Sequence, residues 1–269
     1  MHVIQNEGSA PSSNHQTDNI IERKRSMMTT DAFADWIAGL EHRSGTILKV
    51  IQHVDLEPLY FVNKIAQLGL DVVESNDGAV SIVQEQGDPL DFSRQSWQFP
   101  IHTDGLYHAR IPDLVLLYCR DAGNGATPTV ISDSRAVFKR PGRQLRMDLL
   151  QSLELVYVGK DGKEFPSPLV QCHPHAGFPI LHLGHRAFIR AASTADRQKL
   201  RLSPRRGARI VEALREQMCA AMYIRHYWKA GDALLIDNHT FVHGREAESI
   251  DRQRKLLRIW LSVPKAKQL

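Results

Sequence analysis

The sequence contains little cysteine and no long apolar run. Three cysteines, Cys119, Cys172 and Cys219, lie far apart in 269 residues. An odd number at wide spacing supports neither a disulfide framework nor a CxxC site, so we expect a reducing, cytoplasmic environment. The longest purely apolar run, 114–119, is far short of the ~20 residues that a membrane span needs. The first thirty residues also lack the apolar core of a signal peptide, so we expect neither a membrane span nor export by that route.

Charge of one sign is not in large excess either. Lys and Arg number 34 against 30 Asp and Glu, a net charge of +4, and the basic residues are distributed along the chain. This balance gives no reason to expect a nucleic acid or a membrane as partner. Residues 1–29 are rich in Ser, Asn and Gln with few large apolar side chains, which predicts a disordered leader. We predict a single domain over residues 30–269.

Short apolar segments separated by Gly, Pro and Asp dominate the body of the chain. They predict a mainly β fold with flanking helices, a sandwich or jelly roll. Helices are expected near residues 33–40, 59–66 and 204–222. Two stretches with little periodicity, 160–168 and 184–203, are candidate lids over a site. The segments expected as strands are 46–51, 79–83, 114–119, 129–132, 155–158, 169–172, 179–183, 233–236 and 256–263.

The segment Phe99-Pro100-Ile101-His102-Thr103-Asp104-Gly105 carries the first candidate site. Side chains two apart in an extended segment point to the same side, so His102 and Asp104 can converge on one ion. A second imidazole, His243, follows the strand-like segment 231–238. Two imidazoles and one carboxylate form the facial triad of non-haem Fe(II) oxygenases. Zinc hydrolases use the same ligand types, so the ligands alone leave the metal open.

Two arginines beyond His243 and one threonine favour the oxygenase interpretation. A returning strand would bring Arg254 or Arg258 beside the metal, where a guanidinium suits the distal carboxylate of a dicarboxylic cosubstrate. Thr129 can add a hydroxyl donor to that carboxylate. A zinc hydrolase has no need of such a pocket. Three roles stay open for Arg258: closing the cosubstrate pocket, contacting a carboxylate of the substrate, or pairing with an acidic neighbour such as Asp237.

From about Phe33 to Val263 the sequence resembles the taurine dioxygenase-like Fe(II)/2-oxoglutarate oxygenases. Within this family it is similar to the isonitrile-pathway oxygenases of the paerucumarin and rhabduscin type. The N-terminal part matches poorly, and it helps to wall the pocket. The matching elements are His-Thr-Asp-Gly-Leu-Tyr from His102, the Gly-Ala-Thr-Pro-Thr context of Thr129, His173-Pro174, the run Asp237-Asn238-His239-Thr240-Phe241-Val242-His243-Gly244-Arg245-Glu246-Ala247, and Arg254 with Arg258.

The resemblance implies a double-stranded β-helix, or jelly roll, and a cofactor set of Fe(II), 2-oxoglutarate and O₂. It implies that His102, Asp104 and His243 hold the iron and that Arg254, helped by Thr129, binds the cosubstrate's C5 carboxylate. The reaction it implies is hydrogen abstraction from a small, amino-acid-derived metabolite. The outcome is hydroxylation or desaturation, with release of succinate and CO₂.

Other histidines and aromatics have less specific interpretations. Tyr107, Trp97 and His239 are candidate substrate residues, although packing explains such side chains equally well. The pairs His173-Pro174-His175 and His182-x-x-His185 look like metal clusters, but in a chain with thirteen His we expect loop or strand-face residues. Two other functions stay open: nucleic-acid demethylation by the same chemistry, and an inactive jelly-roll binding protein. The small net charge disfavours the first, and the intact ligand set disfavours the second.

Overall fold

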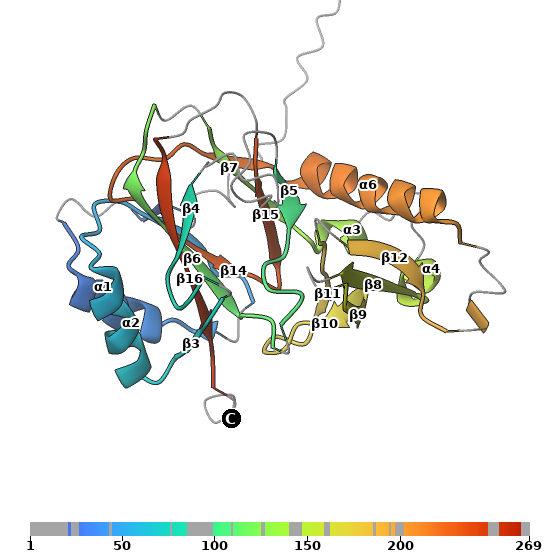
Figure 1. Cartoon of the computed structure of the whole chain (residues 1–269), viewed down its shortest axis with the longest axis horizontal. Coiled ribbons are helices and arrows are strands. Elements are labelled where there is room, and N and C mark those ends of the chain that lie inside the picture. The colour runs from blue at the N-terminus through green and yellow to red at the C-terminus, as the bar shows by residue number, and fades with distance from the viewer. Residues whose placement is uncertain are drawn as a thin grey trace, which may run out of the picture.

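A computed structural model shows two facing β-sheets with helices on both outer sides (Figure 1). The described residues are 21–22, 27–42, 45–75, 77–84, 99–108, 110–124, 127–139, 147–158, 162–184, 187–193, 195–196, 202–246 and 253–264.

The larger sheet has seven strands in the order β1-β2-β14-β6-β16-β3, with β4 also paired to β16. Its central strands β14 and β6 are apolar on both faces, because helices cover one face and the second sheet covers the other. The strands are β1 (Ile21–Glu22), β2 (Leu48–Ile51), β3 (Asp71–Val73), β4 (Ser81–Gln84), β6 (Leu114–Asp121), β14 (Ala233–Asp237) and β16 (Lys255–Ser262).

The smaller facing sheet has four antiparallel strands in the order β13-β7-β15-β5. Alternation of side chains builds the core between the sheets: Leu234 and Ile236 of β14 pack there with Ile131 and Phe241. The strands are β5 (Phe99–His102), β7 (Thr129–Asp133), β13 (Ile224–His226) and β15 (Phe241–Arg245). Two facing sheets of this kind form the predicted jelly roll.

Helices cover the outer faces, as predicted. α1 (Thr30–Ala38) and α2 (Pro58–Gln67) bury Phe33 and Phe61 against the outer face of the larger sheet. α6 (Pro204–Ala221) begins at its Ser203 cap and buries its apolar stripe on the other side of the molecule. The stripe of α6 is therefore core packing, as expected. Two short helices, α3 (Ala136–Lys139) and α4 (Met147–Gln151), were not predicted.

The expected irregular lid stretches are wrong over much of their length. Residues 164–168 and 187–191 form strands on either side of β8 in a three-stranded sheet beside α6. Residues 160–161, 185–186, 194 and 197–201 lie outside the described part. The strands of this sheet and of a separate hairpin are β8 (Leu153–Val158), β9 (Glu164–Pro168), β12 (Ala187–Ala191), β10 (Val170–Cys172) and β11 (Pro179–Leu181).

The end of the stretch expected as a disordered leader belongs to the fold. Residues 21–22 pair in parallel with β2. Met28 is buried, and its backbone exchanges hydrogen bonds with His53 and Asp55. Residues 1–20 and 23–26 lie outside the described part. Within it, no helix has the length and apolar character that crossing a membrane requires. All three cysteines are free thiols, as expected.

Candidate metal centre

The two predicted histidine ligands face each other across neighbouring strands. His102 ends β5 and His243 lies in β15, and the antiparallel register pairs these two residues directly. Directly opposed side chains share one face of a sheet, which places both imidazoles on the inner face, with ring centroids 4.8 Å apart. Gly244 allows this approach, since a Cβ there would lie 2.5 Å from the Phe99 carbonyl oxygen.

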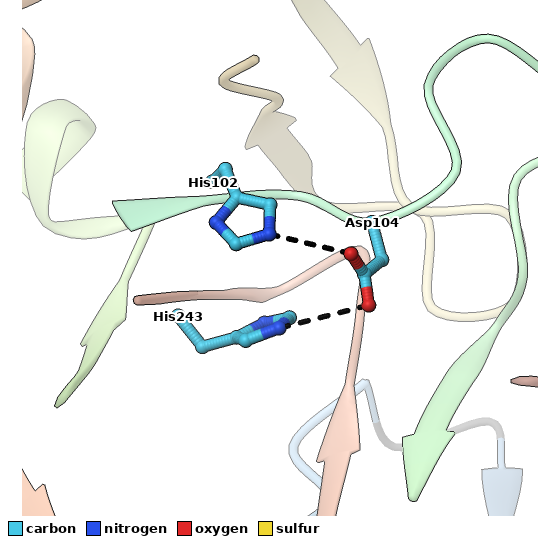
Figure 2. Close-up of side chains that lie close together, drawn as sticks. All are labelled: His102, Asp104 and His243. Atoms are coloured by element: carbon cyan, nitrogen blue, oxygen red, sulfur yellow. Dashed lines mark ion pairs between the residues drawn. The ribbon is translucent and has the colours of Figure 1, made fainter. Parts of the chain in front are cut away.

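Asp104 completes the group from the turn after β5 (Figure 2). Its Oδ1 lies 3.3 Å from His102 Nε2 and its Oδ2 3.7 Å from His243 Nε2. One ligand atom from each of the three residues lies within 4.8 Å of the others, and all three side chains are buried. Gly105 turns the chain away at φ 72°, and a Cβ there would meet the Pro112 ring at 2.5 Å. The predicted triad therefore converges.

Hydrogen bonds hold both imidazoles and the carboxylate in the state that a cation needs. His102 Nδ1 lies 3.0 Å from the Pro100 carbonyl oxygen, and donation to that oxygen leaves the Nε2 lone pair facing Asp104. Burial lowers the pKa of His243 to about 3, so this imidazole is neutral near pH 7. Burial opposes ionisation of Asp104, but Arg258 and the two histidines hold its pKa well below the usual value.

Three further residues position Asp104. The Trp260 indole Nε1 donates to Oδ2 at 3.0 Å, and Arg258 donates to Oδ1 at 3.3 Å. Asn238 accepts from the Asp104 amide at 2.9 Å and donates to the Asp104 and Pro112 carbonyl oxygens at 3.0 and 2.9 Å. Sequence reasoning missed Trp260 and Asn238, because both lie far from Asp104 in the chain.

A cavity of about 440 Å³ opens beside the triad. It contains the predicted cosubstrate residues Thr129, Arg254 and Arg258, so the structure brings them together with His102 and His243. A further guanidinium, Arg245, was not predicted as a site residue. The lining residues in the described part are Val83, Phe99, His102, Leu117, Thr129, His243, Gly244, Arg245, Arg254, Leu256 and Arg258.

Arg254 and Thr129 are buried and oriented by neighbours. Arg254 donates to the Thr127 carbonyl oxygen at 2.9 Å. Thr129 Oγ1 accepts from Trp228 Nε1 at 2.9 Å, which leaves its own hydroxyl hydrogen to donate elsewhere. Arg258 contacts Asp104 and Ser81, so the suggested pairing of Arg258 with Asp237 is wrong.

The candidate substrate residues do not line this cavity. Tyr107 stacks on Tyr157 at 4.8 Å and packs against the core between the sheets. Burial raises the pKa of Tyr107 to about 12. His239 bonds Asp113 at 3.0 Å and lies 3.4 Å from His182. Trp97 lies outside the described residues.

A second buried cluster, which we call the His/Asp network, was missed as a unit. Expected as loop or strand-face residues, its histidines are instead bonded to carboxylates: His173 to Asp237 at 3.1 Å, and His175 to Asp113 at 2.8 Å. Among the described residues, the triad is the one group whose ligand atoms all converge. His185 is not described. The network consists of Asp113, His173, His175, His182, Asp237 and His239.

Two imidazoles and one carboxylate, converging inside a jelly roll beside an arginine-lined cavity, define a non-haem metal centre of the oxygenase type. The family model "Taurine catabolism dioxygenase TauD, TfdA family" matches residues 56–260. The chain therefore belongs to this family of dioxygenases, and the expected family and enzyme class are confirmed.

Relatives and solved structures agree with this assignment. The chain is 25% identical over 201 residues to the tyrosine isonitrile desaturase of Pseudomonas aeruginosa, covering 70% of this chain and 68% of the relative. A structure of PvcB, an Fe, alpha-ketoglutarate dependent oxygenase from an isonitrile synthetic pathway, superposes with TM-score 0.65 at 22% identity over 90% of this chain and 84% of PvcB. An asparagine oxygenase bound to Fe(II), 2S,3S-3-hydroxyasparagine and succinate superposes with TM-score 0.64 at 17% identity, over 86% and 78%. The jelly-roll prediction is confirmed.

Proposed function

We propose that this protein is an Fe(II)- and 2-oxoglutarate-dependent oxygenase. The observation that carries the proposal is the buried convergence of His102, Asp104 and His243 beside a cavity that also contains Arg254. The donor set fits ferrous iron, because it offers two neutral imidazoles and one carboxylate and leaves one side open to the cavity. Bound there with 2-oxoglutarate and O₂, the iron supplies the oxidising power to remove hydrogen from a C–H bond, with release of succinate and CO₂.

The chain's own residues bind the cosubstrate and shield the site. Arg254 takes the C5 carboxylate as a buried guanidinium, and Thr129 donates its free hydroxyl hydrogen to the same group. Arg258 keeps Asp104 ionised and closes the cavity on the metal side. The surrounding apolar side chains, Val83, Phe99, Leu117 and Leu256, exclude bulk water.

The substrate is a small, amino-acid-derived metabolite of specialised metabolism, which is hydroxylated or desaturated. The name of the Pseudomonas relative and the pathway in the PvcB description support this class. We also propose that the enzyme is cytoplasmic and that residues 30–269 act as one domain. The net charge of +4 gives no reason to expect a nucleic-acid substrate.

The test is an anaerobic absorption titration of the metal-free protein with Fe(II) and 2-oxoglutarate. Chelation of the cosubstrate by ferrous iron gives a metal-to-ligand charge-transfer band without any knowledge of the substrate. We expect this band in the wild type and its loss in Asp104→Ala, which removes the one anionic ligand. A correctly folded wild type that forms no band contradicts the proposal and leaves a zinc site or an inactive jelly roll as the better account.

A further inference from the structure

We propose that Trp260 is a positioning residue that holds back one oxygen of Asp104, so that this carboxylate binds its metal through the other oxygen alone. The inference rests on the proposed function, because it concerns the same metal centre. It assigns a role to a residue that touches neither the cavity nor the metal.

The contact is a single, well-defined hydrogen bond. Trp260 is 2% exposed on β16, and its Nε1 donates to Asp104 Oδ2 at 3.0 Å. An indole nitrogen is a donor only, so this bond has one polarity. A bond from a neutral donor to a buried carboxylate is charge-assisted, and it is stronger than a neutral one. Asp104 Oδ2 is therefore held on the side of the larger sheet.

The indole is fixed in place from several sides. The Arg258 guanidinium lies 4.8 Å from the Trp260 ring centroid, and Arg258 Nε is itself anchored to Ser81 Oγ at 3.1 Å. His108 packs edge-on against the same ring at 5.1 Å. Asn238 fixes the backbone of Asp104 through the bonds already described. With the backbone and Oδ2 both held, the rotation of the carboxylate is determined.

Asp104 Oδ1 is the oxygen left facing His102 Nε2, at 3.3 Å. An octahedral ion held by two imidazoles and one carboxylate oxygen keeps three open positions, which two cosubstrate oxygens and O₂ require. A carboxylate that bound through both oxygens would occupy one of these positions. The Trp260 N–H therefore protects an open coordination position without touching it, in the manner of other outer contacts that orient metal ligands.

The experiment uses Co(II), whose visible d–d bands report coordination number, with the variants Trp260→Phe and Tyr118→Phe. Phenylalanine keeps most of the packing but loses the N–H. Tyr118→Phe is the matched control, because it removes a buried-side hydrogen bond, from Tyr118 Oη to the Val54 carbonyl oxygen, on the adjacent strand and away from the triad. Co(II) affinity and spectra are measured with and without 2-oxoglutarate, and circular dichroism and urea unfolding are measured on the metal-free proteins.

We expect Trp260→Phe to bind Co(II) about 10- to 100-fold more weakly and to change the d–d bands, while Tyr118→Phe keeps wild-type affinity and bands. Affinity within threefold of wild type together with unchanged bands overturns the role of Trp260. A wild type that binds no Co(II) overturns the proposed function, and this inference with it. If Trp260→Phe does not fold, 3-benzothienylalanine at position 260 replaces only the N–H by sulfur, and the same two outcomes decide.

Discussion

The triad and the His/Asp network are built from the same residue types and are equally buried, yet they are suited to different tasks. In the triad, two imidazoles and one carboxylate direct ligand atoms toward a common point beside a cavity. In the network, each of three imidazoles already has a carboxylate partner. Asp113 also accepts from the Val263 amide at 2.7 Å. The network joins distant segments of the chain, and the triad leaves its ligand atoms available.

The comparison shows why composition alone does not identify a metal site. A buried carboxylate with several donors is satisfied, and a metal would have to displace those donors. The triad instead brings Nε2 atoms of two histidines onto one carboxylate, where an ion would relieve the crowding of lone pairs. Convergence toward open space separates a ligand set from a structural network.

Removing the carboxylate of the network gives the largest expected effect on folding. Asp113→Ala leaves His175, His239 and the Val263 amide without their acceptor inside the protein. Breaking such a buried charged contact costs about 3–5 kcal/mol, so urea unfolding should shift to a much lower midpoint. Fe(II) affinity of the folded fraction should stay within about threefold of wild type, given the usual size of indirect effects. Loss of metal binding at full stability would erase the distinction between the two clusters.

Removing the cosubstrate arginine tests the open side of the triad. Arg254→Ala should weaken 2-oxoglutarate binding by about 30-fold or more, because truncating one partner of a buried charge pair costs about 2–5 kcal/mol. The affinity for the metal alone should be unchanged. Arg254→Lys, which keeps the charge and loses the planar fork, should lie between alanine and the wild type. Wild-type cosubstrate affinity in the alanine variant would remove the assigned role.

The smallest effect concerns the pH dependence of folding. Burial, with help from His239 and His173, lowers the pKa of His182 to about 3. An unfolded histidine takes up its proton near pH 6.5, so the unfolded state binds more protons between pH 6.5 and 3. Stability from His182 is present above pH 6.5 and is lost as the pH falls, by about 1.4 kcal/mol per pH unit. In His182→Gln, unfolding free energies measured from pH 7.5 to 4.5 should show a shallower slope. An unchanged slope would contradict this role.

The sequence predicted the triad because its residues carry local signals. His102 and Asp104 are two apart in an extended segment, and His243 follows a strand that is plainly apolar. The register that makes His102 and His243 direct neighbours is not encoded locally, because it depends on pairing between strands far apart in the chain.

The network, Asn238 and Trp260 could not be found in the same way. Their partners are distant in sequence, and a histidine bonded to a carboxylate has the same local pattern as a ligand. The strands at 164–168 and 187–191 were mistaken for irregular lids because Pro, Ser and charged residues break the apolar alternation there. An exposed edge position tolerates such residues.

Gly244 has a consequence for how the enzyme tolerates change. It takes part in no chemistry, yet any larger residue would push β15 away from the Phe99 and Ile101 backbone and move His243 with it. In a saturation library scored for turnover, position 244 should therefore be as intolerant as the metal ligands, while every ligating atom is retained. Substituted proteins of this kind would be inactive copies with an intact motif, and a search by motif alone would count them as functional.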